Sequence, residues 1–160
     1  MIPKDFIQKV LINNIGDISY KYHYISFLLI ANGIEFLGKC LDEKHEFNHY
    51  EKGLPRKHFN NAIEELMPKY NSINKKYDLY STLRNGFSHM ISPKAGIWLS
   101  QRKNTNNYNL EEHDEGLILK AEDFYDDFKI ACEEIINRIE TKRLKHEKMD
   151  IDFITTKRLK

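Results

Sequence analysis

Four residue types are scarce in this chain of 160 residues: it contains two cysteines, four prolines, seven glycines and one tryptophan. Two cysteines are too few for the disulfide framework of a small secreted domain. Cys40 and Cys132 lie far apart in the sequence, each within an apolar helical pattern, so we expect two reduced thiols in a core. No repeats, linkers or low-complexity tracts divide the chain, which predicts a single domain over residues 1–160.

The chain also lacks an excess of charge of one sign, because 25 Lys and Arg oppose 24 Asp and Glu. This composition excludes a global basic field of the kind that attracts nucleic acid, so an RNA site would need a local patch or two chains together. Long apolar runs are missing as well. The most apolar stretch, residues 24–38, carries Asn32 and Glu35 and is too short to span a membrane. No signal peptide is visible, and we expect a cytoplasmic protein without membrane contact.

The apolar residues that are present recur mainly at helical spacing. They predict an all-α bundle of about five helices. The expected ranges are residues 3–15, 19–41, 56–67, 77–91 and 121–148, with a polar connection over residues 71–76 and a C-terminal tail over about 149–160. The second helix is apolar around much of its circumference, so it is expected at the centre of the bundle.

Residues 96–120 break the helical pattern. Two short β-like runs, residues 96–100 and 116–120, enclose a polar, turn-forming segment, which predicts a two-stranded hairpin inserted before the last helix. Arg102 and Lys103 on its first strand are candidate RNA contacts. Lys75 and Lys76, just before the fourth helix, are candidates as well, although lysines at such places are more often simply solvated.

The segment 77–92 organises the functional prediction. Leu79, Leu83, Phe87 and either Met90 or Ile91 form an apolar stripe at spacings of three and four. Beside that stripe lie four polar residues, namely Arg84, Asn85, Ser88 and His89. An arginine, an amide and a histidine within two turns are typical of a site that binds a phosphate and moves a proton.

The spacing of these residues limits that hypothesis. Asn85 and His89 lie on one helical face, whereas Arg84 and His89 are roughly 140° apart around a helix of 3.6 residues per turn. A histidine titrates near neutral pH and can act as base or acid, and an arginine offers a planar fork to phosphate oxygens. Together they could cleave RNA without a metal. The alternative is structural: a hydrogen-bonded helical histidine and an arginine in a salt bridge.

The run Arg84-Asn85-Gly86-Phe87-Ser88-His89 resembles the signature of the HEPN superfamily. That resemblance implies a small all-α domain and, in many members, a metal-independent endoribonuclease acting as a toxin, defence effector or RNA-processing factor. It implies that Arg84 and His89 of two protomers meet in one site at a dimer interface, with Asn85 orienting the histidine or the substrate. In HEPN toxins with a nucleotidyltransferase antitoxin, a modified tyrosine follows the histidine by two places. Here that place is Ile91.

Glu35 interrupts the apolar run of the second helix. A buried carboxylate is costly unless it is paired, and Arg84 is the attractive partner. In that case Glu35 would support the site by aiming Arg84. In the alternative, which we favour, Glu35 faces solvent on a partly exposed helix.

Residues 42–57 are strongly polar and contain His45-Glu46-Phe47-Asn48-His49, a match to H-E-x-x-H. On a helix this motif places two histidines on one face for zinc, with the glutamate as base. Glu64 or Glu65 could be nominated as a third ligand. The charged flanks favour a polar loop or frayed helix end instead, in which His58 could join a metal site without catalysis.

The sequence thus favours an endoribonuclease with its site at a homodimer interface, no cofactor, and RNA and an antitoxin or another protein as partners. The main alternative is a non-catalytic HEPN-like domain that binds a partner. A zinc hydrolase built on His45, Glu46 and His49 is a third hypothesis.

Overall fold

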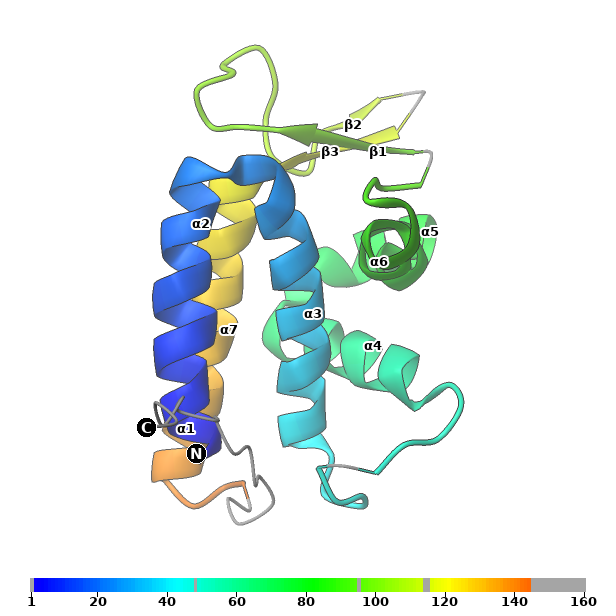
Figure 1. The fold of residues 1–160 in the computed structure, drawn as a ribbon. Helices are drawn as coiled ribbons and strands as arrows, with labels where there is room; N and C mark the ends of the chain where they lie inside the picture. The colour runs from blue at the N-terminus through cyan, green and yellow to red at the C-terminus, as the bar shows by residue number, and fades with distance from the viewer. Residues whose placement is uncertain (1, 48, 95, 114–115, 145–160) are drawn as a thin grey trace, which may run out of the picture.

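The computed structural model describes residues 2–47, 49–94, 96–113 and 116–144. Helices dominate, and a small three-stranded mixed sheet lies across one end of them (Figure 1). The elements are α1 (Pro3–Phe6), η1 (Ile7–Asn14), α2 (Ile15–Lys21), α3 (His23–Leu41), α4 (Leu54–Leu66), η2 (Pro68–Tyr70), α5 (Asn71–Tyr77), η3 (Tyr80–Asn85), α6 (Gly86–Met90), β1 (Ile97–Ser100), β2 (Glu112–His113), β3 (Gly116–Lys120) and α7 (Ala121–Glu140). The expected tail and the continuation of the last helix to residue 148 fall outside the described residues.

The first helical rod is longer than predicted. The helices α1, η1 and α2 follow one another without a break as far as Lys21, so the predicted end near Gly16 is wrong. Gly16 instead allows α2 to approach α7, because a Cβ there would lie 2.5 Å from the hydroxyl oxygen of Tyr125. That hydroxyl donates a hydrogen bond to the carbonyl of Ile12 at 2.6 Å. The glycine therefore marks a packing contact rather than a helix end.

The central position predicted for the second helix is confirmed. Helix α3 packs against α2 and α7 on one side and against α4 on the other (Figure 1). Four of its large apolar side chains are at most 1% exposed, namely Phe27, Ile30, Ile34 and Leu37. Full burial of such a side chain stabilises a fold by about 1.5–3 kcal/mol, so these residues make α3 the axis of the core.

Helix α3 also has the length and composition of a membrane span, contrary to the expectation that its apolar stretch is too short. It has 19 residues, and among the described helices it alone passes that test. Within the fold, 44% of the residues in its apolar window are buried. Core helices of soluble proteins pass the same test, so this feature is weak evidence for a membrane.

The predicted fourth helix is divided. Residues 71–76 form part of α5 rather than a connection, and the chain turns at Asp78, whose φ is +47°. The side chain of Asp78 starts the next segment, because its Oδ1 accepts hydrogen bonds from the backbone N–H of Ser81 at 3.2 Å and from Arg56 at 2.7 Å. Sequence periodicity alone does not reveal this cap.

The apolar stripe of that segment is confirmed only in its first three members. Leu79, Leu83 and Phe87 are at most 1% exposed, whereas Met90 and Ile91 are 57% and 68% exposed. Helix α6 ends at Met90, and Ile91 adopts a left-handed conformation with φ +56°. The buried stripe therefore ends with helix α6, and the side chains of Met90 and Ile91 are exposed to solvent.

The predicted two-stranded hairpin is wrong. Strand β3 lies between the other two strands, parallel to β1 and antiparallel to β2, with Ile97 opposite Leu117 and Glu112 also opposite Leu117. Parallel strands need a long crossover connection rather than a tight turn, and the chain between β1 and β3, which includes β2, provides one. Arg102 and Lys103 therefore follow β1 instead of lying on it.

The two cysteines provide a test of the core. Both are free thiols; Cys132 is fully buried and Cys40 is half-buried. Burial raises the pKa of Cys40 to about 12 and that of Cys132 well above its ordinary value. Because the thiolate is the reactive form, we expect both to resist alkylation at pH 8 in the native protein and to react at once in denaturant. Rapid labelling of native Cys132 would contradict this packing.

Candidate functional site

Two consecutive helical segments carry the residues that sequence reasoning singled out. Arg84 and Asn85 end η3, while Ser88 and His89 lie in α6. The segment η3 is a π-helix, a wider turn that often occurs at functional sites. Its buried Leu83 fixes this turn against the core, so that the polar residues lie at the surface of the bundle.

Glu35, Asn85 and Tyr80 hold Arg84 in place. Its Nε donates a hydrogen bond to Glu35 Oε2 at 2.8 Å, and its Nη1 donates one to Asn85 Oδ1 at 3.2 Å. The guanidinium carbon also lies 5.6 Å from the centre of the Tyr80 ring, within the range of a cation–π interaction. About 25% of the Arg84 side chain remains exposed, so the group is fixed but can still be reached by a ligand.

Glu35 does not face solvent as the favoured alternative expected. It is only 8% exposed and pairs with Arg84 across the contact between α3 and η3. A carboxylate in that position needs the cation, because burial of an unpaired charge is costly. The pair therefore ties the central helix to the segment that carries the candidate site.

Asn85 and Ser88 contact Arg84 rather than His89. The Asn85 amide oxygen accepts a hydrogen bond from Arg84, and the Ser88 hydroxyl donates one to the Arg84 carbonyl at 2.7 Å. Within one chain, the expected role of Asn85 in orienting the histidine thus has no corresponding contact among the described residues.

His89 differs from Arg84 in its surroundings. Its side chain is exposed and forms no hydrogen bond or ion pair with the described ranges 2–47, 49–94, 96–113 and 116–144. Next to it, Tyr24 donates a hydrogen bond to the Ile91 carbonyl at 2.7 Å and packs edge-on against Phe87. The single chain therefore presents an arginine held by its neighbours and a histidine side chain without a partner in the described residues.

Gly86, between the two residues, is required by a close approach of the backbone. A Cβ at Gly86 would lie 2.8 Å from the Ser92 carbonyl oxygen and 3.1 Å from the Lys94 nitrogen. The chain after α6 therefore folds back over this glycine, and the Lys94 N–H donates a hydrogen bond to the Thr82 carbonyl at 3.1 Å. This return places the chain that follows His89 against η3 and the start of α6.

The four candidate RNA contacts have different surroundings. Lys76 forms an ion pair with Glu112, and Arg102 pairs with Asp123 at 2.6 Å and with Asp126 at 2.7 Å. Lys75 is exposed at the end of α5. The structure does not bring these residues together with Arg84, and their role in RNA binding stays a prediction.

Lys103 lines a cavity of about 340 Å³ between the start of α3 and the end of β1. His23, Tyr24 and Gln101 are among the other lining residues. The Nε2 of His23 lies 3.0 Å from Glu122 Oε1, within hydrogen-bond distance. The cavity lies beside Tyr24 and therefore close to the turn that follows His89.

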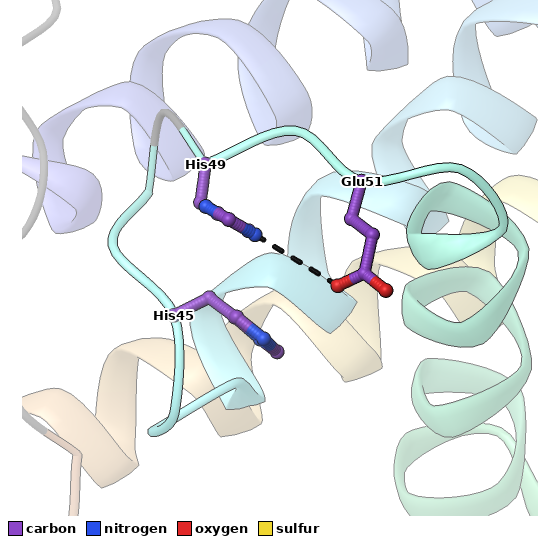
Figure 2. Close-up of side chains that lie close together, drawn as sticks. All are labelled: His45, His49 and Glu51. Atoms are coloured by element: carbon purple, nitrogen blue, oxygen red, sulfur yellow. Dashed lines mark ion pairs between the residues drawn. The ribbon is translucent and has the colours of Figure 1, made fainter.

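The H-E-x-x-H motif lies in a loop, as the charged flanks favoured. Its described residues form no helix, and the backbone N–H of His49 donates a turn hydrogen bond to the Glu46 carbonyl at 2.9 Å. The helical geometry of a zinc hydrolase is therefore missing from the described part of this loop. The rings of His45 and His49 nevertheless stack, with centres 4.8 Å apart and planes 11° apart (Figure 2).

Glu51 is an acidic residue close to His49, and sequence reasoning did not nominate it as a metal ligand. The Nε2 of His49 lies 3.9 Å from Glu51 Oε2 (Figure 2). Of the two acids nominated from the sequence, Glu65 instead pairs with Arg138 at 3.0 Å. The H-E-x-x-H motif of a helix takes its third ligand from another element, which is why Glu64 or Glu65 was nominated. In the irregular loop, Glu51 itself lies close to His49.

Asp42 anchors the same loop to the core. Its Oδ2 lies 2.7 Å from His45 Nδ1 and 2.8 Å from Nε2 of His58, which is buried on α4. Burial alone would raise the pKa of Asp42, but hydrogen bonds from His58, from His45 and from two backbone N–H groups hold that pKa well below its ordinary value. The ionised carboxylate therefore orients the imidazoles of both histidines.

Tyr80 is a second residue that sequence reasoning missed. Its ring lies 4.9 Å from the guanidinium carbon of Arg56 and 5.6 Å from that of Arg84. Nothing in the helical spacing marks a tyrosine as a partner of two arginines from different elements. The contact depends on the packing of α4 against η3.

Comparison with known proteins adds no family to this description: no protein-family model matches the chain, and no curated protein or solved structure does.

Proposed function

We propose that the chain is a HEPN-like, metal-independent endoribonuclease with a composite site at a homodimer interface. The observation that carries the proposal is the arrangement of Arg84 and His89. Arg84 is oriented by Glu35 at 2.8 Å and remains partly exposed, and His89 on the following helix is exposed without a partner in the described residues. Such a pair matches the two roles that the resemblance assigns.

The chemistry needs only these two groups and the RNA itself. His89 would remove the proton from a 2′-hydroxyl or protonate the leaving 5′-oxygen, and proton transfer of this kind contributes about 10²–10⁴-fold to a rate. Arg84 would bind the scissile phosphate and neutralise the charge that builds up on its oxygens. Asn85 would keep the guanidinium in place through its 3.2 Å contact. Attack by the 2′-oxygen leaves a 2′,3′-cyclic phosphate and a 5′-hydroxyl.

The homodimer is supported by the apolar surface beside His89. Tyr24, Met90 and Ile91 are 49%, 57% and 68% exposed, and Tyr24 contacts Ile91 directly. Contiguous exposed apolar residues often mark an interaction site. A twofold contact through this surface would bring the His89 of one protomer toward the site of the other.

The biological setting belongs to the same proposal. A toxin or defence effector in the cytoplasm, with RNA as substrate and an antitoxin or another protein as partner, is what the resemblance implies. Ile91 occupies the place of the tyrosine that nucleotidyltransferase antitoxins modify, so we do not extend the proposal to that mode of inhibition.

A non-catalytic HEPN-like binding domain is the second candidate, and one observation favours it. The charge of Arg84 is already compensated by Glu35 within the chain, and the net charge is only +1. An arginine whose charge is already paired can have a purely structural role. On this alternative, the exposed apolar surface binds a protein partner.

RNA cleavage in EDTA separates the two candidates. The wild type, Arg84→Ala, His89→Ala and the control His113→Ala are compared, with dimerisation and folding measured in parallel. We expect cleavage by the wild type and by the control, and a loss of about 100-fold or more in the other two variants while they remain folded and dimeric. Cleavage that survives in both variants would refute the proposed site, and a wild type inactive on total cellular RNA would favour the binding domain.

A further inference from the structure

The loop between α3 and α4, residues 42–53, gathers a group of side chains that the proposed nuclease site does not use. It leaves the end of α3 that is farther from the sheet (Figure 1). Ligand atoms of His45, His49 and Glu51 all lie within 4.8 Å of one another. The two imidazoles are stacked, and the Glu51 carboxylate turns toward His49 (Figure 2).

We propose that His45, His49 and Glu51 bind one Zn²⁺ ion, which clamps this loop. Two imidazole nitrogens and one carboxylate oxygen form a donor set that zinc takes together with a water molecule. Magnesium and calcium prefer oxygen ligands, so the two histidines favour a transition-type divalent ion. The site differs from a zinc hydrolase of the H-E-x-x-H type, because Glu51 rather than a residue of a distant helix is the third ligand.

A second observation points to a metal independently of this clustering. Histidines that bind metals usually donate their other ring N–H to a carboxylate, which fixes the tautomer and the direction of the ring. His45 has that arrangement: its Nδ1 lies 2.7 Å from Asp42 Oδ2. With Nδ1 protonated by this contact, Nε2 is the nitrogen that would bind the ion. Asp42 in turn is held by buried His58 at 2.8 Å, so the orienting group is itself fixed.

The distances require a small closure of the loop. Ligands of tetrahedral zinc at bond lengths of about 2.0–2.1 Å lie about 3.4 Å from one another. The largest present separation is 4.8 Å, and the pair His49 Nε2 and Glu51 Oε2 is at 3.9 Å. His49 and Glu51 are both exposed, so they can approach the anchored His45 without disturbing the core. The bound ion would join both ends of the loop, one following α3 and the other preceding α4.

The test uses the full chain without a histidine tag, stripped of metal with EDTA and dialysed. Zn²⁺ is titrated by calorimetry, and Co²⁺ is titrated while the visible bands of tetrahedral cobalt are followed. We expect one ion per chain. At 100 times the dissociation constant, Zn²⁺ should stabilise the fold by about 2.7 kcal/mol, which corresponds to an increase of roughly 5–11 °C in Tm for a chain of this size.

Variants identify the ligands. We expect His49→Ala and Glu51→Gln each to weaken Zn²⁺ binding by about 100-fold or more, and Asp42→Asn to weaken it by about 10–100-fold through loss of orientation. His113→Ala is the matched control, because His113 lies 3.2 Å from Glu111 in another exposed histidine–glutamate pair. Because Asp42 also holds His58, the unfolding transition of metal-free Asp42→Asn is measured separately.

Three results would overturn the proposal. The first is the absence of saturable Zn²⁺ binding by the wild type, and the second is Zn²⁺ binding by both His49→Ala and Glu51→Gln that is as tight as that of the wild type. The third is a loss of Zn²⁺ affinity in the control His113→Ala that is as large as the loss in the ligand variants. The outcome is independent of the nuclease proposal, since RNA cleavage is measured in EDTA and these variants leave Arg84 and His89 in place.

Discussion

Replacing Glu35 by alanine is expected to lower the free energy of unfolding by about 2 kcal/mol. Loss of one partner of a buried pair costs about 3–5 kcal/mol, and exposed pairs contribute at most about 1 kcal/mol. The pair between Glu35 and Arg84 lies between these limits, with side-chain exposures of 11% and 25%. Among the described residues, the variant leaves the partly buried guanidinium with its contacts to Asn85 and to the Tyr80 ring. Denaturant unfolding measures the change.

The control is an exposed pair of the same kind. Lys4 and Glu140 form an ion pair with side chains 40% and 52% exposed. We expect Glu140→Ala to leave the denaturant midpoint almost unchanged, because water screens an exposed pair. Equal small effects of Glu35→Ala and Glu140→Ala would mean that the Glu35 pair does not tie α3 to η3.

The same residue tests how Arg84 is positioned. Glu35→Gln keeps a hydrogen-bond acceptor for Arg84 but removes the charge, so we expect it to retain more of the RNA cleavage than Glu35→Ala. Misplacement of a phosphate-binding group by about 1 Å can reduce a rate by about 100-fold. A loss of cleavage by Glu35→Ala under conditions where the variant is fully folded would assign Glu35 a positioning role, and unchanged cleavage would refute that role.

Replacing Gly38 by alanine is expected to have the largest effect on the fold. A Cβ at this position would lie 1.9 Å from the carbonyl oxygen and 2.3 Å from the carbonyl carbon of His58. These are backbone atoms, so the clash cannot be relieved by rotation of a side chain, and α4 must move away from α3. Overpacking usually costs about 1–3 kcal/mol and occasionally more. We expect about 3 kcal/mol, and thus a decrease of roughly 6–12 °C in Tm.

Gly53→Ala separates the effect of space from that of backbone conformation. Gly53 has φ +90°, and no atom of the described part of the chain lies within 4 Å of a Cβ built there. Its replacement costs only conformational strain, about 1 kcal/mol. If Gly38→Ala were no more destabilising than Gly53→Ala, the close contact of α3 with α4 would be wrong.

Helical periodicity predicted the core of the fold because burial repeats along a helix. The stripe of Leu79, Leu83 and Phe87 follows from that repeat, and so does the central helix, which was predicted over residues 19–41 and begins at His23 in the structure. The helix boundaries that were predicted wrongly depend on tertiary and capping contacts, which the apolar periodicity of the sequence does not contain. Gly16 looks like a helix end but is a packing contact with Tyr125, and Asp78 starts a new segment through a side-chain cap.

The sheet could not be predicted from local sequence either. The two apolar runs were visible, but their parallel pairing depends on the crossover between them, and β2 has only two residues, Glu112 and His113. A strand of that length carries almost no periodic signal. Its place beside β3 is determined by backbone pairing.

For the candidate site, residue types identified Arg84 and His89, whereas their surroundings emerged only from the fold. Glu35 was recognised as a partner that needs a cation, but its burial depends on the packing of α3 against η3. Tyr80 and Glu51 gave no signal, because the contacts of Tyr80 join separate elements and Glu51 lies in an irregular loop.

The most direct test of the nuclease proposal is the chemistry of the RNA ends produced in EDTA by the wild type and by His89→Ala. The proposed mechanism predicts products of the wild type with 2′,3′-cyclic phosphate and 5′-hydroxyl ends, no cleavage where the scissile nucleotide is 2′-deoxy, and at least about 100-fold less product from His89→Ala. Products with the same ends and in the same amount from His89→Ala, or cleavage at a 2′-deoxy position, would contradict it.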